Sequence, residues 1–461
     1  EKPYSAFSTS YKRIIICILT INYIVHLMSY NIYFPAIDSI KNSFNTTVAM
    51  VNLTVTGYSV LNGIGPLVWG PFADVWGRRP IFLITFILYI ASNVGLATVD
   101  SFVGFLILRM IQAFVSGPIN ALCAGVVTDI ASPKERGGYF GVITGALMFS
   151  TVFSLFIGGA ITYSLSWRWI FWFLAIGSST ACIITFALLP ETLRAIVDDG
   201  SEYQDRTPLQ LLYTKFNVCC QQTTAEDNGS SKKPYFFKGG FPNILKQLKL
   251  ILEPDVALSA LSSAMHYVIM SSVQTTASTI FPQQYGLNPL QVGLAFLVMG
   301  GGTAIGSVIE GRLLDRDYRI AKEKGLSIYR ARLRSAWIQP VLLQLVVVLY
   351  GWCLYINAHL AVILVLHFII GFVALSMYTV FQTLVVDLFP EKGSSVSGIM
   401  SFVRCDLAAA GVAATEPCLQ ALGFGWTFTV FAGLLATVNI YIFLLARYGP
   451  RWQAKRLDSI Q

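Results

Sequence analysis

The chain has 461 residues, of which 55% are hydrophobic and 12% are charged, and its mean hydropathy is +0.62. This composition excludes a soluble globular domain and predicts a polytopic helical membrane protein. The net charge of +8 does not indicate nucleic-acid binding, because the basic residues lie in the links between apolar runs and not in one compact domain. The eight cysteines form no CxxC motif and no disulfide pattern, so neither a metal site nor a cofactor is expected.

Twelve apolar runs follow one another along the chain, each long enough to cross a bilayer as a helix. They predict an all-α membrane protein with twelve transmembrane helices in two pseudo-symmetric six-helix bundles. The runs cover residues 14–36, 49–73, 80–99, 102–127, 139–163, 169–190, 256–280, 290–313, 335–357, 359–386, 395–420 and 424–446. The predicted domains are a cytoplasmic tail at 1–13, an N-terminal bundle at 14–190, a mostly flexible cytoplasmic linker at 191–253, a C-terminal bundle at 254–446 and a cytoplasmic tail at 447–461.

Lysine and arginine set the expected orientation, because cytoplasmic loops carry an excess of both. With the N-terminus inside, four of the 32 such residues fall outside the cytoplasmic segments, namely Lys41, Arg109, Arg168 and Arg404. The sequence therefore predicts that both termini lie in the cytoplasm.

The link between the second and third runs, residues 70–80, is short and basic, so it is expected at a membrane face. Gly70 begins this link and is expected to let two helices approach closely. Asp74 can accept hydrogen bonds from the start of the next helix, or it can pair with Arg78 or Arg79.

The eighth run ends with the same sequence pattern as the second, because Gly311-x-x-x-Asp315 repeats the spacing of Gly70-x-x-x-Asp74. A short pattern can recur by coincidence. As a true internal repeat, it predicts a 6+6 transporter whose binding site lies near mid-membrane between the halves.

The pattern Gly70-x-x-x-Asp74-x-x-Gly77-Arg78-Arg79 resembles the signature loop of the major facilitator superfamily. Other stretches resemble the fungal twelve-span drug:proton antiporters of that superfamily, in the quinidine-resistance and dityrosine-transporter branch. These stretches are 33–36, 108–113, Asp129 with 133–137, 167–172, 190–194, 387–390, 403–405 and 425–428. The resemblance implies a monomeric, proton-coupled exporter of drugs, weak organic acids or dityrosine-like metabolites in the plasma membrane, working by alternating access.

Two positions depart from the family pattern. Val75 stands where the signature loop usually has a basic residue. The fifth run has Leu155 before Gly158 and Gly159, where antiporters of this group usually place a Gly-Pro pair. Proline would bend the helix by removing a backbone donor, so antiport, symport and uniport all stay open. The two glycines still permit close helix packing.

Polar side chains recur at helical spacing in spans 1, 4, 7 and 10, which agrees with the family's arrangement of these spans around the cavity. Spans 3, 6 and 12 carry no charge in their cores, as expected of helices that face lipid. The candidate substrate contacts are His26, Asn31, Tyr33, Arg109, Gln112, Asn120, His266, Gln274, Tyr378, Gln382 and Arg404.

Arg109 and Arg404 come from different halves and lie within spans. A charge in the bilayer core costs about 2.5–3.5 kcal/mol on insertion scales, so each is expected to face a cavity or a partner. We expect both to favour an anionic or carbonyl-rich substrate. The structural alternative is that Arg109 bonds neighbouring carbonyls and positions span 1.

Proton coupling needs a group that titrates near the working pH. The histidines of spans 1, 7 and 10 qualify by type, although packing within the bundle is the better interpretation of each. Among carboxylates, Asp406 in mid-span 11 is the preferred proton carrier. Glu416, near the outer end of that span, and Glu310, near the inner end of span 8, are the other candidates.

The loop at Asp74 is expected to act as a cytoplasmic latch together with Glu135 and Arg136, holding the halves closed inside in the outward-facing state. The alternative is a loop that only anchors the topology. The gating candidates are Gly70, Asp74, Gly77, Arg78, Arg79, Glu135, Arg136 and Asp315.

An enzyme is not expected, because the sequence has no GxSxG, HExxH, P-loop or Rossmann glycine motif. Within transport, the alternative is a facilitator or symporter for organic anions, sugars or polyamines. A transport-inactive sensor with the same fold is the alternative of a different class. The expected partners are a small-molecule substrate, protons and the lipid bilayer, with no nucleic acid.

Overall fold

The computed structural model describes residues 8–131, 136–197, 249–323, 329, 332–389 and 393–458. These parts of the chain are helical and contain no strand. Helices suit the composition because lipid offers no hydrogen-bond partners, so backbone N–H and C=O groups must be bonded within the element itself. Nine of the described helices are long and apolar enough to cross a membrane. Most of the predicted linker, residues 198–248, lies outside the described residues.

The N-terminal half begins with α1 (Thr9–Asn31), which is followed by two short elements, η1 (Phe34–Ala36) and α2 (Ile37–Ser43). Its other helices are α3 (Val48–Trp76), α4 (Arg78–Thr98), α5 (Phe102–Ser116), α6 (Ile119–Ile130), α7 (Arg136–Ser164), α8 (Arg168–Leu188) and α9 (Arg194–Val197).

The predicted fourth span is built from two helices, α5 and α6, which meet at Gly117 and Pro118. Proline interrupts the helix because it has no backbone donor. A Cβ at Gly117 would overlap the backbone carbonyl of Asn62, so the break also lets this span press against α3.

The C-terminal half begins with η2 (Lys249–Leu252), and α17 (Gly393–Asp458) is its longest helix. At about 1.5 Å per residue, α17 is too long for one crossing. It is divided at Gly423, whose φ of 73° is in the left-handed region that favours glycine, and it therefore supplies the predicted spans 11 and 12. Between these two elements lie α12 (Pro254–Tyr285), α13 (Pro289–Glu323), η3 (Ser335–Trp337), α15 (Ile338–Tyr355) and α16 (Leu360–Leu388).

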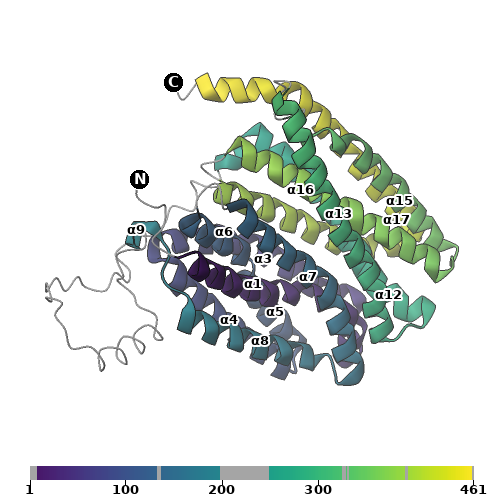
Figure 1. The fold of residues 1–461 in the computed structure, drawn as a ribbon. Helices are drawn as coiled ribbons and strands as arrows, with labels where there is room; N and C mark the ends of the chain where they lie inside the picture. Colours follow the sequence, from purple (N-terminus) through teal and green to yellow (C-terminus); the bar gives the residue numbers. More distant parts are fainter. Residues whose placement is uncertain are drawn as a thin grey trace, which may run out of the picture.

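The helices form two bundles side by side, as Figure 1 shows. Between the bundles, α3 lies against α17 and α7 lies against α13. The prediction of two six-helix bundles is confirmed. We call the end of the molecule at which α1 and α12 begin the starting end, and the opposite end the far end.

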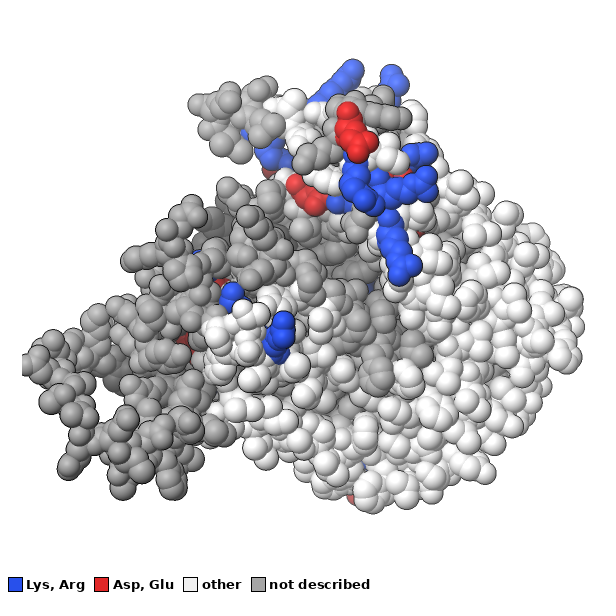
Figure 2. All heavy atoms as spheres, viewed as in Figure 1, with Lys and Arg blue, Asp and Glu red and all other residues white. Residues whose placement is uncertain are grey.

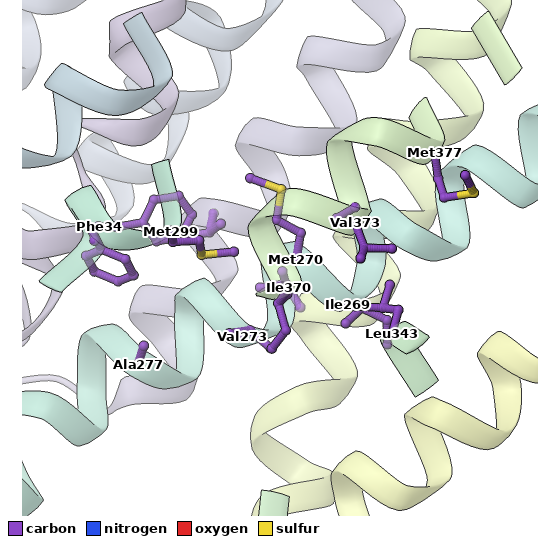
Figure 3. Packing of buried hydrophobic residues seen from close by; sticks show 14 of the residues in the cluster. Phe34, Ile269, Met270, Val273, Ala277, Met299, Leu343, Ile370, Val373 and Met377 are labelled. Atoms are coloured by element: carbon purple, nitrogen blue, oxygen red, sulfur yellow. The ribbon is translucent and has the colours of Figure 1, made fainter. Parts of the chain in front are cut away.

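Apolar packing joins the two bundles near the far end. Phe34, from the N-terminal half, lies beside Met299 of α13 and near α12 in Figure 3. The rings of Phe34 and Phe296 lie 6.5 Å apart between their centroids. The same buried cluster continues between α12 and α16, through residues such as Ile269 and Ile370.

The peripheral helices expose large apolar side chains, as a lipid-facing surface requires. Ile87 of α4, Ile183 of α8 and Ile440 of α17 are 61%, 68% and 58% exposed. This exposure is compatible with the expectation that spans 3, 6 and 12 face lipid, which stays a prediction. Figure 2 shows that lysines and arginines gather at the starting end, near the ends of α13 and α17, above a surface with few charges.

Candidate functional site

Arg404 of α17 lies between two tyrosine rings from other helices of its half. Its guanidinium carbon is 4.6 Å from the ring centre of Tyr267 on α12 and 4.8 Å from that of Tyr378 on α16. The side chain is half-buried, and its Nε has no hydrogen-bond partner. Among the described residues, no carboxylate forms an ion pair with it. The guanidinium is therefore held by cation–π contacts and keeps its charge available for another group.

The N-terminal half lies close to Arg404. Tyr23 of α1 is within electrostatic range of both Arg404 and Tyr378. The Tyr23 hydroxyl donates a hydrogen bond of 3.2 Å to Asn120 of α6. Nearby, Tyr30 of α1 lies 3.5 Å from the hydroxyl of Ser271 on α12. The guanidinium contacts two tyrosines of its own half, and tyrosines of the N-terminal half lie close to this group of side chains.

Asp406 lies two residues after Arg404, on the face of α17 that meets α3. A Cβ at Gly63 of α3 would be 3.4 Å from the Asp406 Oδ1 and 3.1 Å from the Cβ of Cys405. The Asp406 Oδ1 is buried and has no hydrogen-bond partner. Asp406 is thus an unpaired carboxylate at the contact between the halves.

Arg109 is placed quite differently, because it is 1% exposed inside the N-terminal half. Its guanidinium donates to Gln112 and, over 2.9 Å, to the backbone carbonyl of Ser29. It also lies 4.4 Å and 4.2 Å from the ring centres of Tyr33 and Tyr58. These contacts join α1, α3 and α5, so the packing supports the structural alternative for Arg109.

Replacing Arg109 by alanine should lower the midpoint of thermal unfolding more than replacing Arg404 does. Hydrogen bonds to charged groups contribute about 1.5–3 kcal/mol each, and only Arg109 has such bonds to buried partners. Thermal unfolding of the two purified variants in the same detergent measures the difference. Equal losses of stability would contradict this assignment.

The loop at Asp74 is an ion network within the N-terminal half. Arg78 Nη1 lies 2.6 Å from Asp74 Oδ1, and its Nε donates over 3.1 Å to Asp129 Oδ2 at the end of α6. The carboxylate of Glu191 accepts hydrogen bonds from the backbone N–H groups of Arg78 and Arg79 at the start of α4. A carboxylate at a helix N-terminus bonds free N–H groups and complements the helix dipole.

Two glycines of this loop have different roles. At Gly77 the φ of 106° and the nearby Glu191 carboxylate, 2.5 Å from where a Cβ would be, both require glycine. At Gly70 a Cβ would meet nothing within 4 Å, so the expectation that Gly70 permits close helix approach is wrong. The helices simply do not pack closely at that position. Glu135 lies outside the described residues, and only the backbone of Arg136 and Asp315 is described.

The C-terminal half has its own ion pairs at the starting end. Arg332 bonds the carboxylate of Asp387 at 2.8 Å and the backbone carbonyl of Leu314 at 3.0 Å. Arg456, near the end of α17, bonds Asp255 and Glu253 at the start of α12. In the described parts of the chain, the ion pairs at the starting end therefore each stay within one half.

The remaining predicted residues are scattered through both halves. The imidazole of His26 packs on Phe86 and Tyr89 inside the N-terminal half, and that of His266 lies near Phe381 inside the C-terminal half. Gln382 donates to Ser397 over 2.7 Å, and Glu310 accepts from Gln339 over 2.6 Å. Asn31 ends α1, Gln274 is buried in α12, and Glu416 lies near the far end of the first part of α17.

The sequence interpretation did not select Tyr23, Tyr267 or Glu191 as site residues. The two tyrosines were overlooked because aromatic residues count as apolar in a hydropathy pattern. Tyr267 nevertheless continues the serine spacing of Ser259 and Ser263, which could have identified it. Glu191 was noted in a motif, but its partner lies more than 100 residues away, and a local pattern does not show such a contact.

The halves touch backbone to backbone at the far end. A Cβ at Gly159 of α7 would be 2.5 Å from the carbonyl of Pro289 and 3.0 Å from the Cα of Gly293, both on α13. A Cβ at Gly158 would overlap the carbonyl of Ile32 at the end of α1. The prediction that this glycine pair permits close packing is confirmed.

Comparison with known proteins gives consistent matches over nearly the whole chain. The profile described as Major Facilitator Superfamily matches residues 19–414. Citrate exporter 1 of Aspergillus niger is 31% identical, over 99% of this chain and 89% of its own length. Quinidine resistance protein 1 of Saccharomyces cerevisiae is 28% identical, over 99% of this chain and 86% of its own.

Solved structures show the same fold at lower sequence identity. The human organic anion transporter MFSD10 has a TM-score of 0.61 at 18% identity, covering 94% of this chain and 99% of that chain. A D-xylose-proton symporter has a TM-score of 0.66 at 14% identity, covering 94% of this chain and 97% of that chain.

Proposed function

The chain belongs to the major facilitator superfamily, and on this premise we propose that it is a proton-coupled exporter of small organic molecules. It is a multi-pass membrane protein, and its relatives are fungal transporters and not enzymes. The relatives include proteins named as a citrate exporter and as multidrug transporters. The proposed substrates are therefore weak organic acids, drugs or dityrosine-like metabolites, with organic acids favoured by the site.

The observation that carries this proposal is the unpaired Arg404 between the halves. A guanidinium in a low-dielectric site attracts a carboxylate strongly and can bond it through two parallel N–H groups. The aromatic rings of Tyr267 and Tyr378 beside the guanidinium would suit an acid with an apolar or aromatic body. Arg404 is the proposed main substrate contact, with Tyr378, Asn120 and Gln382 beside it.

Alternating access requires the halves to close at one end while they separate at the other. The far end is joined by Gly159, Gly293 and the Phe34 cluster, whereas the ion pairs between described residues at the starting end each stay within one half. We assign this arrangement to a conformation open toward the starting end. Because basic residues gather at that end, the starting end is proposed to be cytoplasmic. We further propose that the protein lies in the plasma membrane and works as a monomer.

The gating residues are proposed to act through the N-terminal half. Arg78 holds Asp74 and Asp129 together, and Glu191 fixes the start of α4. When the starting end closes, this rigid network would meet α17 and the C-terminal half, with Arg79, Glu135, Arg136 and Asp315 nearby. The halves, residues 14–190 and 254–446, would then move as two bodies joined by the linker.

Proton coupling is proposed to use Asp406, because its buried oxygen has no partner and lies at the contact between α17 and α3. Replacing Asp406 by asparagine should abolish export driven by a pH gradient while leaving substrate exchange at equal pH within about threefold of the unmodified protein, because the amide cannot release a proton. Both rates can be measured in proteoliposomes. Unchanged gradient-driven export would move the role to Glu416 or Glu310.

A substrate panel in proteoliposomes tests the function as a whole. Labelled organic acids, amines and lipophilic drugs are loaded, and their efflux is followed with and without a pH gradient. Acid efflux that the gradient accelerates supports the proposal. Efflux at the same rate with and without the pH gradient would favour an organic-anion facilitator. No efflux of any compound would favour a sensor.

A further inference from the structure

A cavity lies between the halves near the far end, and neither Arg404 nor its tyrosine neighbours line it. It has a volume of about 180 Å³ and is walled by α3 of the N-terminal half and by α12 and α17 of the C-terminal half. Its lining residues are Asn52, Thr275, Thr276, Thr279, Ile280, Gln283, Thr415, Glu416, Leu419, Gln420 and Phe424.

Three of the four threonine hydroxyls that line this cavity already donate to carbonyls of their own helix. Thr275 donates to the carbonyl of Ser271 over 2.9 Å, and Thr415 donates to that of Gly411 over 2.7 Å. The hydroxyl of Thr279 donates similarly to the carbonyl of Thr275. Each threonine oxygen therefore retains lone pairs, so these side chains act as acceptors toward the cavity.

The other polar groups are one carboxylate and three amide side chains, and the amides of Asn52, Gln283 and Gln420 carry donors as well as acceptors. Glu416 contributes a carboxylate, and it receives the amide N–H of Gln420 over 3.1 Å. The Oδ1 of Asn52 is buried, belongs to a side chain that is 3% exposed, and has no hydrogen-bond partner. The Oγ1 of Thr276, also on a residue that is 3% exposed, has no partner either. No lysine or arginine is among the residues that line the cavity.

An adjoining cavity connects this region with the loops of the far end. It shares Ile280, Gln283 and Phe424 with the first cavity and reaches Asn357 and Gly423. Asn357 follows α15, and Gly423 forms the turn between the two spans of α17. A small solute can therefore approach the acceptor-lined cavity from the far end without passing the Arg404 site.

We infer that this cavity binds the ammonium group of a small organic amine. An ammonium group carries a positive charge and three N–H donors. These match the carboxylate of Glu416, the unbonded oxygen of Asn52 and the threonine oxygens, in a cavity that no lysine or arginine lines. The apolar side chains of Ile280, Leu419 and Phe424 would contact the alkyl part of the amine. The cavity thus has the opposite polarity from the Arg404 site, and this inference does not depend on the proposed function.

The binding of an amine here would also favour the conformation in which the far end is closed. The walls come from both halves, so the ligand would contact α3 and α17 together only while these helices lie side by side. A ligand shifts a conformational equilibrium by its difference in affinity for the two states.

The test compares three probes of equal size on the purified full chain in nanodiscs. Saturation-transfer NMR should show a signal for propylammonium and none for propanol, and added propionate, which the Arg404 site would take, should not displace the propylammonium. Replacing Glu416 by glutamine should weaken propylammonium binding at least tenfold. The control Asp100→Asn removes a carboxylate that is 93% exposed at the same end, outside the cavity, and should leave binding unchanged.

Several outcomes would overturn the inference. Equal signals from propanol and propylammonium would show a cavity that selects for the alkyl group, and equimolar potassium displacing the amine would show an inorganic cation site. If propylammonium still binds the Glu416→Gln variant, the amine site lies elsewhere in the protein. The comparison of three probes on the unmodified chain decides the question even if a variant fails to fold.

Discussion

Replacing Arg404 by alanine should reduce the export of an anionic substrate about 100-fold, while the protein stays folded and inserted. A hydrogen-bonded contact with a charged group contributes about 3 kcal/mol at the upper end, which corresponds to this factor. The loss should appear in transport and not in stability, because Arg404 has no hydrogen bond or ion pair to the described residues that the substitution would break. Initial rates in proteoliposomes at several substrate concentrations measure the effect.

The lysine variant separates charge from shape at this position. Arg404→Lys keeps the positive charge but loses the planar group that lies over Tyr267 and Tyr378, so it should retain part of the activity. Arg109→Ala gives the contrasting case, because its guanidinium is enclosed by the N-terminal half and its loss should appear in stability first. Full transport by Arg404→Ala, in a variant that unfolds at the same temperature as the unmodified protein, would remove Arg404 from the site.

Replacing Gly293 by valine should separate the halves at the far end and reduce transport at least tenfold. A Cβ at Gly293 would be 2.9 Å from the carbonyl of Leu155 and 3.2 Å from the Cα of Gly159, and both are backbone atoms that cannot rotate away. Overpacking of this kind costs typically about 1–3 kcal/mol, and opening the far end relieves it. The starting-end-open conformation should therefore lose population.

Gly301 supplies the control on the same helix, because a Cβ there would meet nothing within 4 Å. Gly301→Val should change neither transport nor the distance between the halves. Spin labels on cysteines placed at Leu165 and Tyr355, both exposed near the far end, report that distance in a cysteine-free background. Distances that stay the same in Gly293→Val would mean that the contact between α7 and α13 does not hold the far end closed.

Some features of the site could be predicted from the chain, and others could not. The ion pairing of Asp74 with Arg78 depends on residues four positions apart, so the sequence reveals it directly. The interpretation of Gly70 was wrong because no local pattern shows whether another helix comes near a glycine. The role of Glu191 depends on a contact with the start of α4, which only the packing of α8 against α4 creates.

The two intramembrane arginines show the limit most clearly. Each is one charge in an apolar span, and by composition and depth they are equivalent. Packing makes Arg109 a structural centre among Ser29, Gln112 and two tyrosines, and it leaves Arg404 open between the halves. The difference arises from which helices lie beside each arginine.

By itself, the sequence determined that this protein crosses the membrane many times, in two similar halves, and which end carries the basic residues. It could do so because hydropathy and charge act on each segment separately, through transfer from water to lipid. Only the tertiary structure decided which polar groups are already bonded and which remain available, as at Arg404, Asp406 and Asn52. Hydrogen bonding and close contact depend on neighbours from distant segments, and those neighbours exist only after the helices have packed.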